Sequence, residues 1–122
     1  MLELIKLWIK EVNRKKSLRA LLKELYFSFA IKIDQAIIYL TIKNGHVHLN
    51  ESSEHENPLK RIEGEEEIFL SIILGEQKLR EAVKSKKIST TVSYRELLLL
   101  ESLFFLAKPN LLSKFAKKAP LF

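Results

Sequence analysis

The segment from 95 to 107 has the sequence Arg95-Glu-Leu-Leu-Leu-Leu-Glu-Ser-Leu-Phe-Phe-Leu-Ala107, and it holds more apolar side chains than one helix face can cover. Ser93 and Glu96 have the spacing of a capping box, in which each residue satisfies a backbone N–H of the first helical turn. Pro109 follows the last apolar residue and cannot continue a helix. We therefore predict a helix over residues 95–107.

This predicted helix is apolar on nearly every side. Leu98 and Phe105 fall on the side that Glu101 and Ser102 otherwise make polar. The helix is too short to span a bilayer, which takes about 20 apolar residues. Two interpretations stay open. The additional apolar side chains are buried in the core or in a dimer interface, or else one side of the helix faces an apolar ligand.

The composition indicates one globular domain over residues 1–122. Hydrophobic residues make up 47% of the chain and charged residues 30%, which is typical of a folded protein. The absence of cysteine excludes disulfides and zinc–thiolate sites. Charged residues interrupt the apolar residues of 2–12, which indicates an amphipathic helix and not a signal peptide. We therefore expect a reducing, cytoplasmic setting.

The net charge of +6 is concentrated at the two ends of the chain. Residues 1–25 carry seven Lys or Arg against three Glu, and residues 108–122 carry four Lys and no acid. These Lys-rich ends predict either a solvated surface or transient contact with an anionic membrane surface. The basic residues are not interleaved with exposed aromatics, so we expect no nucleic-acid partner.

From Phe27 onward the hydrophobic period changes from that of a helix to two, the period of a half-buried strand. Asn44-Gly45 is a strong signal for a two-residue hairpin turn, and Asp34-Gln35 is a second candidate. These turns predict a three-stranded antiparallel meander over 27–50 with one apolar face. The predicted cross-strand pairs are Ile31 with Ile38, Phe29 with Leu40, Ile42 with Val47 and Leu40 with Leu49.

The remaining elements are helices and short strands. The order of elements segregates strands from helices, which favours an α+β fold. The predicted elements are a helix over 2–13, a short helix capped by Ser17, a brief strand over 59–63, helices over 65–74 (ending at Gly75) and 77–84, a strand over 88–93, and a basic amphipathic C-terminal tail over 110–122.

The sequence contains no pattern of residues typical of catalysis or of cofactor binding. The three glycines are too far apart for a phosphate-binding loop. His46 and His48 share one side of a strand, but that side is predicted to face solvent and lacks a third ligand. Glu65-Glu66-Glu67 opens a helix, where the dipole favours acids. We predict no catalytic residue, no metal and no cofactor, and therefore not an enzyme.

The order of elements from 2 to 107 resembles that of the sterol carrier protein type 2 (SCP2-like sterol-binding domain) family. Residues 62–75 resemble the family's weak strand and the helix after it, which starts with an acid or hydroxyl residue and ends in Gly. Residues 79–83 resemble its short segment, 87–92 its Lys-Ile strand and 96–106 its Leu-rich helix. Ser85-Lys86 and Ser93 stand where the family often has glycines.

The resemblance implies an antiparallel, five-stranded sheet with helices packed on one face, enclosing a hydrophobic tunnel for a sterol, fatty acid or fatty acyl chain. We therefore expect non-enzymatic lipid binding and transfer, by a monomer or homodimer. The alternative is a homodimeric interaction module with a solid core and no lipid. The candidate ligand-binding residues are Phe69, Ile72, Ile73, Leu79, Val83, Leu98, Phe104, Phe105, Leu112 and Phe115.

Overall fold

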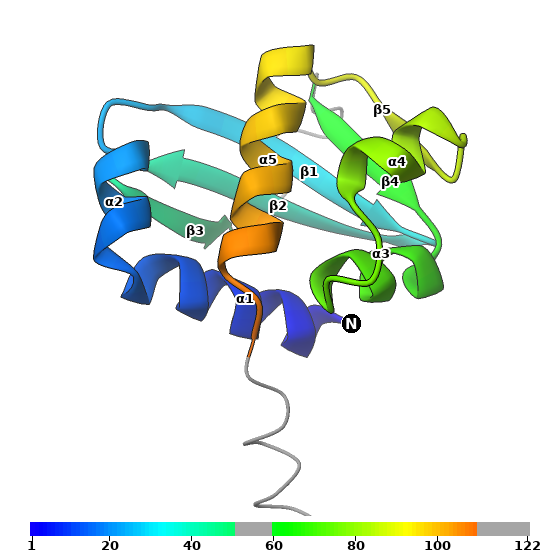
Figure 1. Ribbon diagram of the computed structural model, residues 1–122, viewed down its shortest axis with the longest axis horizontal. Helices are drawn as coiled ribbons and strands as arrows, with labels where there is room; N and C mark the ends of the chain where they lie inside the picture. The colour runs from blue at the N-terminus through cyan, green and yellow to red at the C-terminus, as the bar shows by residue number, and fades with distance from the viewer. Residues whose placement is uncertain (51–59, 110–122) are drawn as a thin grey trace, which may run out of the picture.

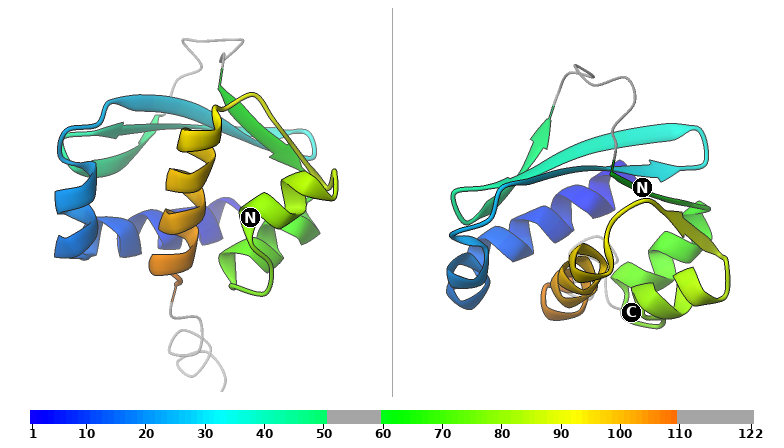
Figure 2. Two further views of the ribbon diagram at one scale, coloured as in Figure 1. Left: turned by 45° about the horizontal axis from the view of Figure 1, so that its top comes forward. Right: turned by 90° about the horizontal axis from the view of Figure 1, so that it is seen from above.

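The computed structural model describes residues 1–50 and 60–109, which form a five-stranded sheet with helices on one face (Figures 1 and 2). The strand order is β3-β2-β1-β4-β5. The expected α+β class is confirmed. The helices are α1 (Leu2–Arg14), α2 (Lys16–Leu22), α3 (Glu66–Ile73), α4 (Leu79–Lys84) and α5 (Tyr94–Leu106); the strands are β1 (Phe27–Ile33), β2 (Ala36–Lys43), β3 (His46–Asn50), β4 (Arg61–Gly64) and β5 (Ile88–Thr90).

The meander from β1 to β3 has the register that the sequence predicts. All four predicted cross-strand pairs are present in the sheet. Asp34, Asn44 and Gly45 have φ values of 54°, 55° and 79°, the left-handed conformation that tight hairpin turns require. The alternating apolar side chains of β1 and β2 consequently share the face that the helices cover. Those buried there are Phe27, Phe29, Ile31, Ile33, Ile38, Leu40 and Ile42.

The fully antiparallel sheet implied by the family resemblance is wrong at one strand pair. β4 runs parallel to β1, with Ala30 opposite Arg61 and Ile33 opposite Gly64. Asn50 at the end of β3 is level with Tyr39, and Tyr39 is level with Ala30. The first residue of β4 is therefore level with the last residue of β3, and the two strands run in the same direction. In the sheet, β4 lies three strand spacings from β3, about 14 Å.

Two further local predictions need correction. Ser17 does not cap α2, because the helix already begins at Lys16 and its N-cap residue is Lys15. Lys15 is extended, with φ −83° and ψ 116°, so a single residue separates α2 from α1. The last strand stops at Thr90, since the Thr90 hydroxyl accepts a hydrogen bond from Val92 N at 3.1 Å and turns the chain away.

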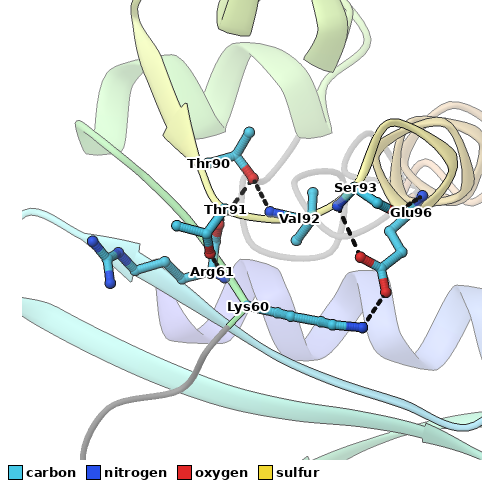
Figure 3. A network of polar contacts seen from close by, with 7 residues as sticks. All are labelled: Lys60, Arg61, Thr90, Thr91, Val92, Ser93 and Glu96. Carbon is cyan, nitrogen blue, oxygen red and sulfur yellow. Dashed lines mark hydrogen bonds and ion pairs between the residues drawn. The ribbon is translucent and has the colours of Figure 1, made fainter.

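The start of α5 is tied to the sheet by the polar contacts in Figure 3. The predicted capping box is confirmed: Glu96 N donates to Ser93 Oγ at 3.1 Å, and Ser93 N donates to Glu96 Oε1 at 2.9 Å. Lys60, just before β4, forms an ion pair with Glu96. Burial alone raises the pKa of Glu96, but the hydrogen bonds from Lys60 and Ser93 outweigh it and lower the pKa below its ordinary value.

The C-terminal part of α5 packs on α1 through the one tryptophan of the chain. Trp8 is fully buried, and its ring stacks on Phe104 with centroids 4.5 Å apart. Its indole N–H donates to Leu103 O at 3.2 Å. Helix α5 is thus fixed against the sheet at its start and against α1 further along. The predicted tail over 110–122 lies outside the described residues.

Candidate functional site: a groove beside the last helix

Two adjoining hollows form a groove between α5 and the α3–α4 connection, segments that lie side by side in Figures 1 and 2. The larger hollow has a volume of about 150 Å³ and the smaller about 50 Å³. Both are lined by Lys78, Glu101 and Phe105. The smaller one reaches inward to Ile72, Gly75, Gln77, Leu79 and Phe104, and the larger one also touches Ser102.

Gly75 shapes one end of the groove. It follows α3 with φ +82°, and its N–H donates to Ile72 O at 3.1 Å, so it is the predicted helix-ending glycine. A side chain here would collide with the stem of Lys108, which crosses directly over Gly75. The Lys108 ammonium lies 4.8 Å from the centre of the Phe105 ring. Lys108 therefore covers the end of the groove beyond α5.

The polar rim of the groove is centred on Glu101. Its carboxylate accepts from Arg80 Nε at 2.7 Å and from Arg80 N at 3.0 Å. These contacts neutralise Glu101, and the hydrogen bond to Glu101 raises the pKa of Arg80. The Ser102 hydroxyl is turned back to Leu98 O at 2.9 Å. The Lys78 ammonium, by contrast, has no hydrogen bond or ion pair with any of the residues in 1–50 and 60–109.

The predicted ligand-binding residues fall into four groups. Ile72, Leu79, Phe104 and Phe105 line the groove. Phe69 and Ile73 are completely buried in the core, where they touch neither hollow. Val83 and Leu98 are half-buried and line neither hollow. Leu112 and Phe115 lie outside the described residues. Neither hollow is an enclosed tunnel, so the tunnel stays a prediction.

Apolar side chains are exposed near the ends of the two helices that flank the groove. On α5, Phe105 is 58% exposed and Leu106 is 45% exposed. On α3 and just after it, Leu70 is 39% exposed and Leu74 is 37% exposed. The fold therefore covers most of the apolar residues of both helices, but it leaves these side chains largely in contact with water.

Sequence reasoning missed the polar rim residues Gln77, Lys78, Glu101 and Ser102 as parts of the site. The available signal was that Glu101 and Ser102 alone interrupt the apolar run of α5. His48 lies exposed on its strand, and its ring centroid is 6.3 Å from that of the half-buried His46. Within 1–50 and 60–109, no three potential ligands gather around a metal position.

A mixed sheet with helices on one face and an apolar groove at the helix ends defines a small α+β binding domain. Residues 6–91, well over half of the chain, match the model of the SCP-2 sterol transfer family. The chain belongs to this family. No curated protein matches the sequence. None of the described helices is long and apolar enough to cross a membrane.

Solved structures share this fold at low sequence identity. The UbiJ-SCP2 ubiquinone synthesis protein is 11% identical with a TM-score of 0.66, over 95% of this chain and 89% of that one. Sterol carrier protein 2 of Yarrowia lipolytica, in its apo form, is 12% identical with a TM-score of 0.58, over 86% and 89%. The sec-alkyl sulfatase PisA1 is 14% identical with a TM-score of 0.60, over 74% of this chain but 14% of the enzyme.

Proposed function

We propose that this protein binds a lipid in the groove between α5 and the α3–α4 connection and carries it without chemical change. The observation that carries the proposal is the surplus of exposed apolar side chains around a groove whose floor is Ile72, Leu79 and Phe104. Exposed apolar clusters beside a groove mark binding sites. The ligand classes that fit are a sterol, a fatty acid or a fatty acyl chain.

The groove must widen to hold such a ligand. Its hollows measure about 150 and 50 Å³, whereas ligand pockets usually have about 300–1,000 Å³. Burying ten methylenes contributes about 8 kcal/mol. This gain exceeds the cost of moving Phe105, which is already 58% exposed. The bound lipid would then cover the apolar surface that the fold leaves open.

Delivery of a lipid requires contact with a membrane, and the Lys-rich N-terminal helices suit an anionic one. Exposed Lys or Arg near such a surface contributes about 1 kcal/mol each. Lys10, Lys16 and Lys23 are exposed along α1 and α2. We expect the protein to sediment with vesicles that contain phosphatidylglycerol and to stay in solution with phosphatidylcholine alone.

Native mass spectrometry of protein purified without delipidation tests the proposal, together with displacement of a fluorescent fatty acid. Phe105→Ala should weaken fatty acid binding about fivefold, because about half of a phenylalanine's burial energy is lost. Tyr26→Ala is the matched control, since Tyr26 is 74% exposed and lines neither groove hollow. Two results together would support the homodimeric interaction module instead: the protein copurifies with no lipid, and it sediments as a dimer that Phe105→Glu dissociates.

A further inference from the structure

We propose that Lys78 selects a lipid with an anionic head group, a carboxylate, over a neutral lipid with the same apolar chain. This inference rests on the proposed function and adds the chemical class of its ligand. Among the residues that the structure describes, Lys78 is the one cation that lines both hollows of the groove. Lys78 is exposed and lines the larger, more open hollow, where the polar end of a bound lipid would lie.

The charges around the groove leave Lys78 in excess at the larger, outer hollow, whereas the Lys108 ammonium lies over Gly75 at the end of the smaller one. Glu101 lines the same hollows, but Arg80 neutralises it through two contacts of 2.7 and 3.0 Å. Glu76 is exposed and lines neither hollow. The Lys78 ammonium forms no ion pair with any residue that the structure describes. The groove therefore carries a net positive charge at its mouth, beside neutral apolar walls.

The placement of apolar and polar groups fits an amphipathic ligand with a single charged end. Phe104, Ile72 and Leu79 line the inner hollow with apolar side chains, and the Gln77 amide beside them already accepts a hydrogen bond from Ser71 Oγ at 3.2 Å. Lys78 and Ser102 lie at the outer hollow of about 150 Å³. An acyl chain would pass inward between Phe105 and Leu79, with its carboxylate left at the outer hollow. A sterol places a neutral hydroxyl there and gains nothing from the ammonium charge.

The test compares cis-parinaric acid with its methyl ester, two fluorescent probes that share one chain and differ in head-group charge. At pH 8 and low salt, the acid should bind the wild-type protein about fivefold more tightly than the ester, the size expected for a solvent-accessible ion pair. Lys78→Met should abolish this preference by weakening the acid alone. Lys78→Arg should retain it.

Lys84→Met is the matched control, because Lys84 is exposed at the far end of α4 and lines neither hollow. It changes the net charge equally and should leave the preference intact. Equal binding of acid and ester by the wild-type protein overturns the inference alone, as does equal weakening of both probes by Lys78→Met. Binding of neither probe overturns the proposed function and this inference with it.

Discussion

One side chain of α1, that of Asn13, forms hydrogen bonds with the backbone of the edge strand β3. The effect of removing this side chain on stability can be calculated. Asn13 Oδ1 accepts from Val47 N at 2.8 Å, and Asn13 Nδ2 donates to Val47 O at 2.9 Å. β3 is an edge strand, so without Asn13 these backbone groups have no strand to pair with. Open strand edges invite pairing with other chains. The substitution Asn13→Ala removes both hydrogen bonds together.

The magnitude follows from two opposing terms. Each hydrogen bond contributes about 1 kcal/mol net, which gives a loss of about 2 kcal/mol. Alanine is a better helix former than asparagine, which returns about 0.5 kcal/mol at this position near the end of α1. The free energy of unfolding should therefore fall by about 1.5 kcal/mol. Water can reach the freed Val47 groups, because the contact is only partly buried, so no full desolvation cost is added.

Urea unfolding followed by Trp8 fluorescence measures this change, since Trp8 is the one tryptophan and lies in the core. Asn50→Ala is the control: Asn50 is also on β3, but its side chain donates to Thr41 Oγ1 on the exposed face and not to the edge. The control should lose less than about 1 kcal/mol. A loss below about 0.5 kcal/mol for Asn13→Ala would refute the edge-closing role, and sedimentation should show association of this variant alone.

Three further outcomes are expected. Because folding lowers the pKa of Glu96, its ionised carboxylate stabilises the folded state above its ordinary pKa of 4.5, and this stabilisation is lost as the pH falls through the lowered pKa of the folded state. The melting temperature of Glu96→Gln should therefore fall less than that of the wild-type protein between pH 7 and pH 3. Gly75→Ala should cost about 1 kcal/mol or more in urea unfolding, because φ is +82° and the new methyl group displaces Lys108. Lipid binding should change Trp8 fluorescence, because Trp8 stacks on Phe104 in the groove wall, and Phe104→Leu should reduce that change.

The parts of the fold that follow from the sequence are those determined by neighbouring residues. The alternation in β1 to β3 and the Asn44-Gly45 turn fix the register, because a slip of one residue would expose the whole apolar face. The direction of β4 depends instead on a crossover between distant strands. Ser17 failed as a cap because the break at Lys15 starts the helix earlier than the residue type alone suggests.

Of the residues that line the groove, only the apolar ones could be predicted from the sequence. The surplus of apolar residues on α3 and α5 is visible in the sequence, and the structure leaves Phe105 and Leu74 exposed. The polar rim depends on which loop approaches Glu101, and its partner Arg80 lies 21 residues away. No local pattern reports that contact. Lys78 likewise has no significance in the sequence until α4 and α5 are placed side by side.

The contacts of α5 determine which wall of the groove gives way to a ligand. On the sheet side, Lys60 pairs with Glu96 and the capping box fixes the helix start. On the α1 side, Trp8 is stacked and hydrogen-bonded in a site without solvent, and freeing it would cost several kcal/mol.

On the remaining side, the start of α4, which directly follows the α3–α4 connection, is tied to α5 across the rim by the ion pair of Arg80 with Glu101. The Arg80 side chain is 43% exposed. Exposed ion pairs contribute at most about 1 kcal/mol. This contact is much weaker than the buried one to Trp8. A lipid that enters the groove should therefore displace the α3–α4 connection and leave α5 on the sheet, so that Trp8 senses the ligand through Phe104 without leaving the core.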